Sequence, residues 1–325
     1  MSATEMRYVH AIAQALRDSM DADSDVMLLG EDIAGAGGSF KATRGLLETF
    51  GPERVRDTPI SEASIVSAAV GAALSGAKPV VEIMFMDFIT LAMDALVNQA
   101  AKARFMFGGQ GSVPMVLRTP HGGGLSAGPQ HSQCLEAWLA HVPGLKVVCP
   151  STAQDAYSLL RAAIDDPDPV MFIEHKALYT AKGTVDTDVV AAIGSARIAR
   201  SGRDVTVVSY GATVAVCLSA AERLALEGIE VEVVDLRTVQ PWDRATVLAS
   251  LARTHRAVIV HEAVQAFGVG AEIAATLADD GFDELDAPVV RVGAPFMPVP
   301  FATSLEKAYQ VDADAVIAAI RKTLL

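Results

Sequence analysis

Two residues of the chain have the type and setting for acid–base chemistry. Glu62 follows the proline-containing turn at residues 57–61 and begins an apolar stretch of small residues. The helix dipole also stabilises an acid at a helix start, so this position alone has a purely structural explanation. His131 follows a glycine-rich loop, in the polar type of turn that often forms sites at the carboxyl ends of α/β sheets. His121, in the same loop system, is a second candidate of this kind.

Several common catalytic motifs are missing from the sequence. There is no G-x-S-x-G elbow in a suitable context, no P-loop, no HExxH pair and no EF-hand loop. The glycine-rich segment 31–40 has Phe40 where a dinucleotide fingerprint needs glycine, which disfavours a nicotinamide-dependent dehydrogenase. From these residues alone, Glu62 and His131 are candidate acid and base groups without a named reaction.

Composition limits the class of protein. The 325 residues suggest about two domains, and 51% hydrophobic residues with 20% charged residues allow large cores. The net charge of −13 and the lack of an apolar run of about 20 residues lead us to expect neither nucleic acid nor membrane as a partner. The N-terminus does not resemble a signal peptide. The cysteines form no CxxC pair and suit a reducing cytoplasm; they are Cys134, Cys149 and Cys217.

Short apolar strands alternate with helices along most of the chain, which predicts an α/β fold with mainly parallel sheets. Residues 87–104 and 303–323 are each expected to form one long helix. The alternation weakens after residue 180. We therefore predict a first domain at 1–185, a linker at 186–200 and a second domain at 201–325.

Seven short segments, in order along nearly the whole chain, resemble the beta subunit of thiamine-diphosphate-dependent 2-oxo acid dehydrogenases, the decarboxylating component of the pyruvate, branched-chain and acetoin complexes. Each segment is weak alone, but the ordered set is specific. They are Leu29-Gly30-Glu31-Asp32, Thr43-Arg44-Gly45-Leu46, Arg54-Val55-Arg56-Asp57-Thr58-Pro59-Ile60-Ser61-Glu62, Gln130-His131-Ser132-Gln133, Pro143-Gly144-Leu145-Lys146-Val147-Val148, Val233-Val234-Asp235-Leu236-Arg237-Thr238 and Asp286-Ala287-Pro288.

The resemblance implies a pyrimidine-binding domain followed by a transketolase C-terminal-like domain, assembled with an alpha subunit as an α2β2 tetramer. In split enzymes of this family the GDG…N motif that binds the diphosphate and Mg²⁺ lies on the alpha subunit. This chain has no GDG sequence. It therefore looks like half of an active site for thiamine diphosphate.

The resemblance also assigns roles to individual residues. Glu62 matches the family glutamate that binds the aminopyrimidine nitrogen, and His131 the histidine linked to reductive acylation of the lipoyl group. Phe88 and Met84 match positions beside the pyrimidine ring. A structural K⁺ site of some relatives falls on Met115, Ala163, Ile164, Asp166 and Asp168, where Asp168 replaces an asparagine of some relatives.

We therefore expect an oxidoreductase subunit that decarboxylates a 2-oxo acid, pyruvate above all, and passes the acyl group to lipoyl-lysine on an acyltransferase core. Two alternatives stay open. One is an acetoin dehydrogenase beta subunit, which Met106-Phe107-Gly108-Gly109 and Arg118-Thr119-Pro120-His121-Gly122 resemble, and the other is a non-catalytic subunit with the same fold. An acidic run could dock a basic domain of the core, or it could be a solvated helix end: Asp279, Asp280, Asp283, Glu284 and Asp286.

Overall fold

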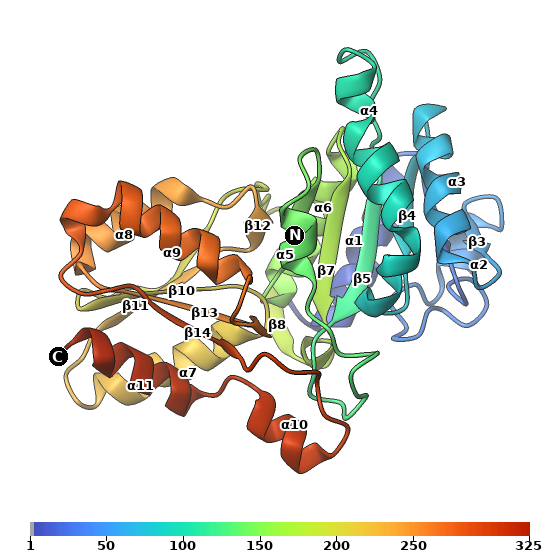
Figure 1. Cartoon of the computed structure of the whole chain (residues 1–325). Coiled ribbons are helices and arrows are strands. Elements are labelled where there is room, and N and C mark those ends of the chain that lie inside the picture. The colour runs from blue at the N-terminus through green and yellow to red at the C-terminus, as the bar shows by residue number, and fades with distance from the viewer. Residues whose placement is uncertain (1–2) are drawn as a thin grey trace. The chain divides into compact units, whose positions relative to one another are not determined.

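The computed structural model describes residues 3–325, and contacts within the chain divide it into two compact units. The first unit combines residues up to His121 with Trp138–Ile193, and the second combines Gly122–Ala137 with Gly194–Leu325. The second unit thus contains the segment that carries His131, which the predicted ranges assigned to the first domain. Figure 1 shows the helices and strands of both units.

The first unit is built on a parallel sheet. Its strands run in the order β6-β7-β5-β4-β2-β3 and are all parallel. They are β2 (Val26–Gly30), β3 (Val55–Asp57), β4 (Lys78–Glu82), β5 (Val116–His121), β6 (Lys146–Val148) and β7 (Val170–His175). The chain moves outward from β2 to β3 and then returns past β2 to β4. This reversal creates a switch point, where α/β proteins commonly bind ligands.

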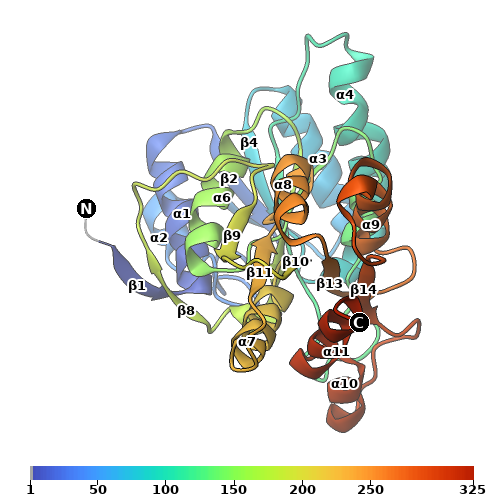
Figure 2. The ribbon, with the colours of Figure 1, turned by 90° about the vertical axis from the view of Figure 1, so that its left-hand side faces the viewer.

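Helices cover both faces of this sheet. Alternate apolar side chains of the strands, such as Val80, Val116 and Phe172, form one core with α1 (Tyr8–Ala22) and α6 (Ala153–Asp165). On the other side, α3 (Glu62–Leu74) packs against β4. The remaining elements are α2 (Leu46–Phe50), α5 (Glu136–Ala140), η3 (Lys176–Leu178) and the antiparallel pair of β1 (Thr4–Arg7) with β8 (Lys182–Val185), seen beside α1 in Figure 2.

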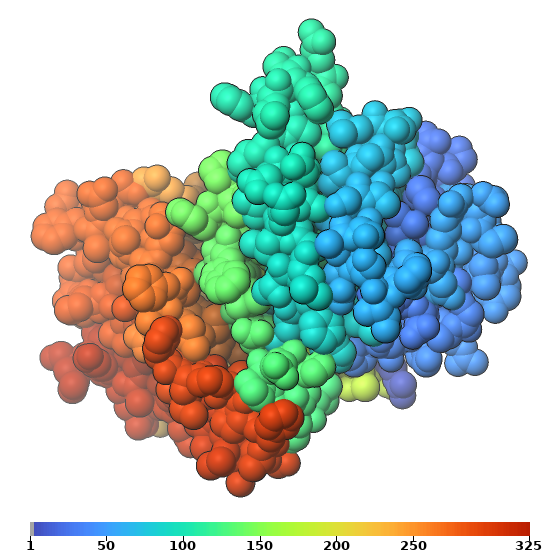
Figure 3. All heavy atoms as spheres, turned by 45° about the vertical axis from the view of Figure 1, so that its right-hand side comes forward, coloured from blue at the N-terminus to red at the C-terminus, as the bar shows by residue number. Residues whose placement is uncertain are grey.

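The single helix expected over residues 87–104 is wrong in detail. The chain forms a 3₁₀ helix η1 (Met86–Ala92), a π helix η2 (Ala95–Ala100) and α4 (Ala101–Met106). Met86, Ile89 and Ala92 are buried at intervals of three residues, which matches the three residues per turn of a 3₁₀ helix. The end of α4 stands out from the first unit in Figure 3 and exposes Phe105 and Met106.

The second unit holds a five-stranded sheet in the order β14-β13-β10-β11-β9, with only β9 antiparallel to its neighbour. Helices α7 and α11 share a core on one face, and α8 and α9 contact the strands as well. The elements are β9 (Arg197–Arg200), β10 (Val205–Ser209), α7 (Thr213–Ala225), β11 (Val231–Asp235), β12 (Thr238–Gln240), α8 (Arg244–Thr254), β13 (Ala257–Val264), α9 (Val269–Asp280), η4 (Phe282–Glu284) and β14 (Val290–Ala294).

The helix expected over residues 303–323 is broken into α10 (Thr303–Tyr309) and α11 (Ala313–Thr323). Gln310 has an extended backbone, and the side chain of Asp312 accepts a hydrogen bond from the Ala315 amide at 2.8 Å. An aspartate in this position caps the start of a new helix. No helix within residues 3–325 is long and apolar enough to span a membrane.

Candidate active site

Two buried glutamates lie at the carboxyl edge of the first sheet. Glu31 directly follows β2 and is 6% exposed, whereas Glu62 begins α3 and is 7% exposed. Burial raises the pKa of Glu31, and the charge of Glu62 raises it further, although the Ser61 amide opposes this by donating a hydrogen bond. Glu31 Oε1 is buried without a hydrogen-bond partner among the described residues. The pair therefore has capacity to bind a polar ligand group.

The loop after β2 is fixed beside this pair. Asp57, at the end of β3, accepts hydrogen bonds from the Ala34 amide at 2.7 Å and from the Gly35 amide at 3.4 Å. The Thr43 hydroxyl donates to the Ile33 carbonyl at 2.7 Å. The turn at residues 57–61, which looked like a simple connection in the sequence, thus also holds the opposite loop in place.

The proposed pyrimidine contacts lie at the start of the irregular helical segment. Met84 follows β4 and Phe88 is in η1, and both are half-buried. The Phe88 ring packs edge-to-face on Phe85, with 5.9 Å between ring centroids. These partly accessible apolar side chains are compatible with a flat ligand ring, and their role stays a prediction.

His131 lies in the segment 122–137, which packs with the second unit. Its amide donates to the Gly128 carbonyl at 3.3 Å and closes a turn. Gly128 has a φ of +76°, and a Cβ there would lie 2.2 Å from the Phe301 ring. The positive φ favours glycine at this position, so the conformation of the turn before His131 depends on Gly128.

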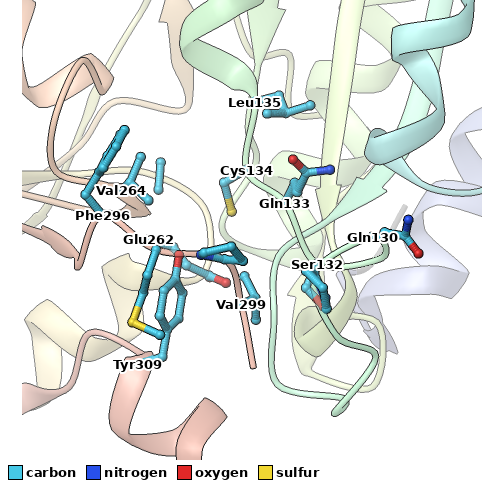
Figure 4. Close-up of a pocket in the computed structure, with 14 residues that line it drawn as sticks. Gln130, Ser132, Gln133, Cys134, Leu135, Glu262, Val264, Phe296, Val299 and Tyr309 are labelled. Atoms are coloured by element: carbon cyan, nitrogen blue, oxygen red, sulfur yellow. The ribbon is translucent and has the colours of Figure 1, made fainter. Parts of the chain in front are cut away.

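A cavity of about 500 Å³ adjoins this turn (Figure 4). Ser132 and Gln130, on either side of His131, contribute to its wall, together with apolar residues such as Phe296 and Val299. Tyr309 also lines the cavity; burial raises the pKa of its phenol to about 12, with further effects from Cys134 and Glu262. The phenol is therefore protonated at neutral pH. No pattern in the sequence indicated this cavity.

The residues matched to a K⁺ site have hydrogen bonds and ion pairs within the chain. The Val170 amide donates to the Met115 carbonyl at 2.9 Å, and the Asp166 amide to that of Ala163 at 3.3 Å; Ile164 lies within the same last turn of α6. The Asp166 carboxylate pairs with Lys146 at 2.6 Å, and the Asp168 carboxylate pairs with Arg104. Both carboxylates therefore face cationic side chains, which leaves backbone carbonyls as the fitting donors for a metal.

The structure separates the sequence candidates into two groups. Glu62, Met84 and Phe88 belong to the first unit, and His131 to the second. His121, the second histidine candidate, ends β5 and is 3% exposed, with its ring 5.2 Å from that of His175. The buried Glu31 was not among the sequence candidates, although it lay in one of the matched segments.

Family models match both parts of the chain. The transketolase pyrimidine-binding domain matches residues 4–182, and the transketolase C-terminal domain matches residues 194–316. A solved chain described as a split-gene transketolase, inactive beta4 tetramer, has a TM-score of 0.82 at 23% identity and covers 98% of both chains. This likeness supports the fold, and the predicted two-domain α/β class is confirmed.

Curated relatives are similar over nearly the whole chain. The pyruvate dehydrogenase E1 component subunit beta-2 of Oryza sativa subsp. japonica is 44% identical over 99% of this chain and 87% of the relative. The 2-oxoisovalerate dehydrogenase subunit beta of Bacillus subtilis is 44% identical over 98% of both chains. The acetoin:2,6-dichlorophenolindophenol oxidoreductase subunit beta of Cupriavidus necator is 45% identical over 97% and 96%. The chain therefore belongs to the family of 2-oxo acid and acetoin dehydrogenase beta subunits.

Proposed function

We propose that this chain is the beta subunit of a thiamine-diphosphate-dependent 2-oxo acid dehydrogenase. With an alpha subunit it oxidatively decarboxylates a 2-oxo acid, pyruvate in the first instance, and transfers the acyl group to lipoyl-lysine of an acyltransferase core. The observation that carries this proposal is the similarity to several such beta subunits over nearly the whole chain, together with the buried Glu62 at the position the family uses.

The acidic pair fits the pyrimidine end of thiamine diphosphate. Glu62 would hold a proton against the ring nitrogen, and the free oxygen Oε1 of Glu31 offers a further acceptor nearby. Met84 and Phe88 would provide apolar contact for the ring. When bound, the cofactor supplies an electron sink for decarboxylation. The diphosphate and its Mg²⁺ would be held by the alpha subunit, because this chain has no GDG sequence.

His131 would exchange a proton with the lipoyl sulfur during acyl transfer. Histidine is suited to this step because its unperturbed pKa lies close to neutrality. The fixed turn at Gly128 supports the role, since a proton-transfer group must be held within hydrogen-bond distance of its partner.

A structural K⁺ would be held by carbonyl oxygens of Met115, Ala163 and Ile164 and by the backbone of Asp166 and Asp168. Lys146 and Arg104 neutralise the two carboxylates, so we expect weak binding. Replacing K⁺ by tetramethylammonium at constant ionic strength should lower the thermal midpoint of unfolding. An unchanged midpoint would exclude a stabilising K⁺ site.

Two exposed apolar side chains of the first unit would suit a subunit contact. Phe105 and Met106 at the end of α4 are 89% and 71% exposed, which suits contact with another subunit and supports an alpha partner in an α2β2 tetramer. We propose a location in the cytoplasm, because no disulfide joins the three cysteines among residues 3–325.

The acidic run of the second unit is partly neutralised within the chain. Asp280 pairs with Arg244, Glu284 lies 3.6 Å from His255, and Asp286 pairs with Arg256 at 3.3 Å. Docking of a basic domain of the acyltransferase core would therefore depend mainly on Asp279 and Asp283. Binding of the core that does not weaken as salt rises would count against docking at this run.

A second candidate function is oxidation of acetoin, favoured by the similarity to two acetoin-oxidising beta subunits. Steady-state rates of the reconstituted complex with pyruvate, branched-chain 2-oxo acids and acetoin would decide between these substrates. The substrate with the highest kcat/KM identifies the branch.

Glu62→Gln in the reconstituted complex tests the catalytic proposal. The amide keeps the size of the side chain but cannot act as the acid, so we expect a loss of turnover on the order of a hundredfold or more. The matched control is Glu48→Gln, because Glu48 is exposed in the same unit. Wild-type turnover of Glu62→Gln would refute the catalytic role and leave the non-catalytic subunit as the explanation. Calorimetric titration with thiamine diphosphate would show whether the variant still binds it.

A further inference from the structure

Backbone amides of the segment that carries His131 donate hydrogen bonds to two carboxylates. The Gly123 amide donates to Glu262 Oε1 at 2.7 Å. The Gly124 amide donates to Glu306 Oε1, and the Ser126 amide to Glu306 Oε2, both at 2.8 Å. Each oxygen of Glu306 thus accepts one amide of a short loop that lies about 180 residues earlier in the sequence.

Glu306 has no competing cation. It lies on α10, is 3% exposed and forms no ion pair with a lysine or arginine within residues 3–325. A buried carboxylate is strongly unfavourable unless hydrogen bonds compensate for lost water. Here the compensation comes from the two loop amides and, at 3.3 Å, from the Ser126 hydroxyl. The stability of the carboxylate and the conformation of the loop are therefore coupled.

The loop needs this support because its backbone is strained. Ser126 has a φ of +53°, in the left-handed region that residues other than glycine seldom adopt. Its hydroxyl also contacts the Thr303 hydroxyl at 2.9 Å, at the start of α10. Strained backbone of this kind persists only where surrounding contacts fix it, and such sites are often functional.

The same C-terminal segment supports the turn next to His131. Gly128 packs directly against Phe301, which lies just before α10, and the His131 amide donates to the Gly128 carbonyl. Figure 1 shows α10 beside this loop. The segment 301–306 therefore contacts the loop on both sides of Ala127.

We propose that Glu306 is a positioning residue for acyl transfer to lipoyl-lysine: by accepting the Gly124 and Ser126 amides it sets the loop conformation that places His131. This inference rests on the proposed function. It predicts that Glu306 affects the lipoyl half-reaction selectively, because decarboxylation depends on Glu62 in the other unit.

The test compares Glu306→Gln with wild type in the complex reconstituted with the alpha subunit. Glutamine retains one acceptor oxygen and replaces the other with an amide group, which cannot accept. We expect hydrogen exchange at Gly124 or Ser126 to rise at least about tenfold, and acyl transfer to a lipoyl domain to fall by roughly ten- to a hundredfold. Decarboxylation measured with 2,6-dichlorophenolindophenol as electron acceptor should stay within about twofold of wild type.

Two further variants sharpen the experiment. Glu222→Gln changes an exposed glutamate of the same unit and should leave every readout unchanged. Thr303→Val removes the hydroxyl contact to Ser126 without removing a charge. It therefore tests whether the segment 301–306 holds the loop 123–126 if Glu306→Gln folds poorly. It should raise exchange at Ser126 in the same direction, by a smaller factor.

Unchanged hydrogen exchange at residues 123–126 in Glu306→Gln would show that Glu306 does not hold the loop, and would overturn the proposal. Equal losses in both half-reactions, with a lower unfolding midpoint, would also overturn it, because they would show a structural role only. If wild type decarboxylates no 2-oxo acid, the proposed function fails together with the assigned step. The hydrogen-exchange measurement would still show whether Glu306 holds the loop. A failure of the proposed function can therefore be distinguished from a failure of the Glu306 contact.

Discussion

The strongest stability prediction concerns Arg118, which is buried in the middle of the first sheet. Its Nη1 donates to Glu82 at 2.8 Å, and its Nε and Nη2 donate to the two oxygens of Glu174 at 2.7 and 3.0 Å. Burial alone would lower the pKa of Arg118, but Glu174 and Glu82 raise it overall. One guanidinium therefore compensates two buried carboxylates on the neighbouring strands β4 and β7.

Arg118→Met should remove all three hydrogen bonds and leave the two carboxylates buried without a cation. Breaking a buried ion pair from one side costs about 3–5 kcal/mol. For a unit of this size, 1 kcal/mol corresponds to roughly 2–4 °C, so the thermal midpoint should fall by roughly 6–20 °C. The measurement is thermal unfolding of the full chain followed by circular dichroism.

Two control variants distinguish destabilisation by an uncompensated buried charge from destabilisation by a lost contact. Arg321→Met removes an exposed pair with Glu227 and should cost less than about 1 kcal/mol. The combined variant Arg118→Met, Glu82→Gln, Glu174→Gln removes the charges together and should recover more than half of the loss. The compensation of two carboxylates by Arg118 is refuted if Arg118→Met lowers the free energy of unfolding by less than about 1 kcal/mol. It is also refuted if the combined variant is as unstable as Arg118→Met alone.

Three other changes have distinct expected outcomes. Burial lowers the pKa of His261, so the folded state binds a proton at this ring less readily than the unfolded state does. The free energy of unfolding should therefore fall as the pH drops below about 6.5. His261→Gln should reduce that fall, as measured by urea titration at several pH values. Gly144→Ala should destabilise strongly in thermal unfolding, since its Cβ would lie 1.9 Å from the Ala101 carbonyl oxygen. Gly128→Ala should slow acyl transfer to the lipoyl domain in a single-turnover assay, because a side chain at a φ of +76° strains the turn before His131 and the Phe301 ring would have to move.

Much of the fold could be predicted from local patterns. Buried parallel strands are rich in apolar residues, so segments such as Val231–Asp235 and Val170–His175 were recognisable without tertiary information. The predictions failed where packing, rather than propensity, decides the backbone. The segment from Met86 to Met106 has a good helical composition, but burial at intervals of three residues selects a 3₁₀ helix at its start.

The candidate site was predictable only in part, for a related reason. Glu62 and His131 are visible in the sequence because each stands in a distinctive local segment. Glu306 and Glu262 act on the loop through contacts 182 and 139 residues apart, and no local pattern marks them. Glu31 stood in a recognisable segment, but its raised pKa comes from burial and from the nearby charge of Glu62, and only the fold creates these.

The way each buried carboxylate is compensated distinguishes structural from functional acids. Both oxygens of Glu174 accept hydrogen bonds from Arg118 or Tyr179, and both oxygens of Glu306 accept hydrogen bonds from the loop 124–126. Glu31 has a raised pKa, a second acid beside it and one oxygen without a partner. Stability alone would favour removing such a pair, and perturbed, uncompensated groups of this kind concentrate at functional sites. This contrast supports the proposal that Glu31 and Glu62 form a ligand site.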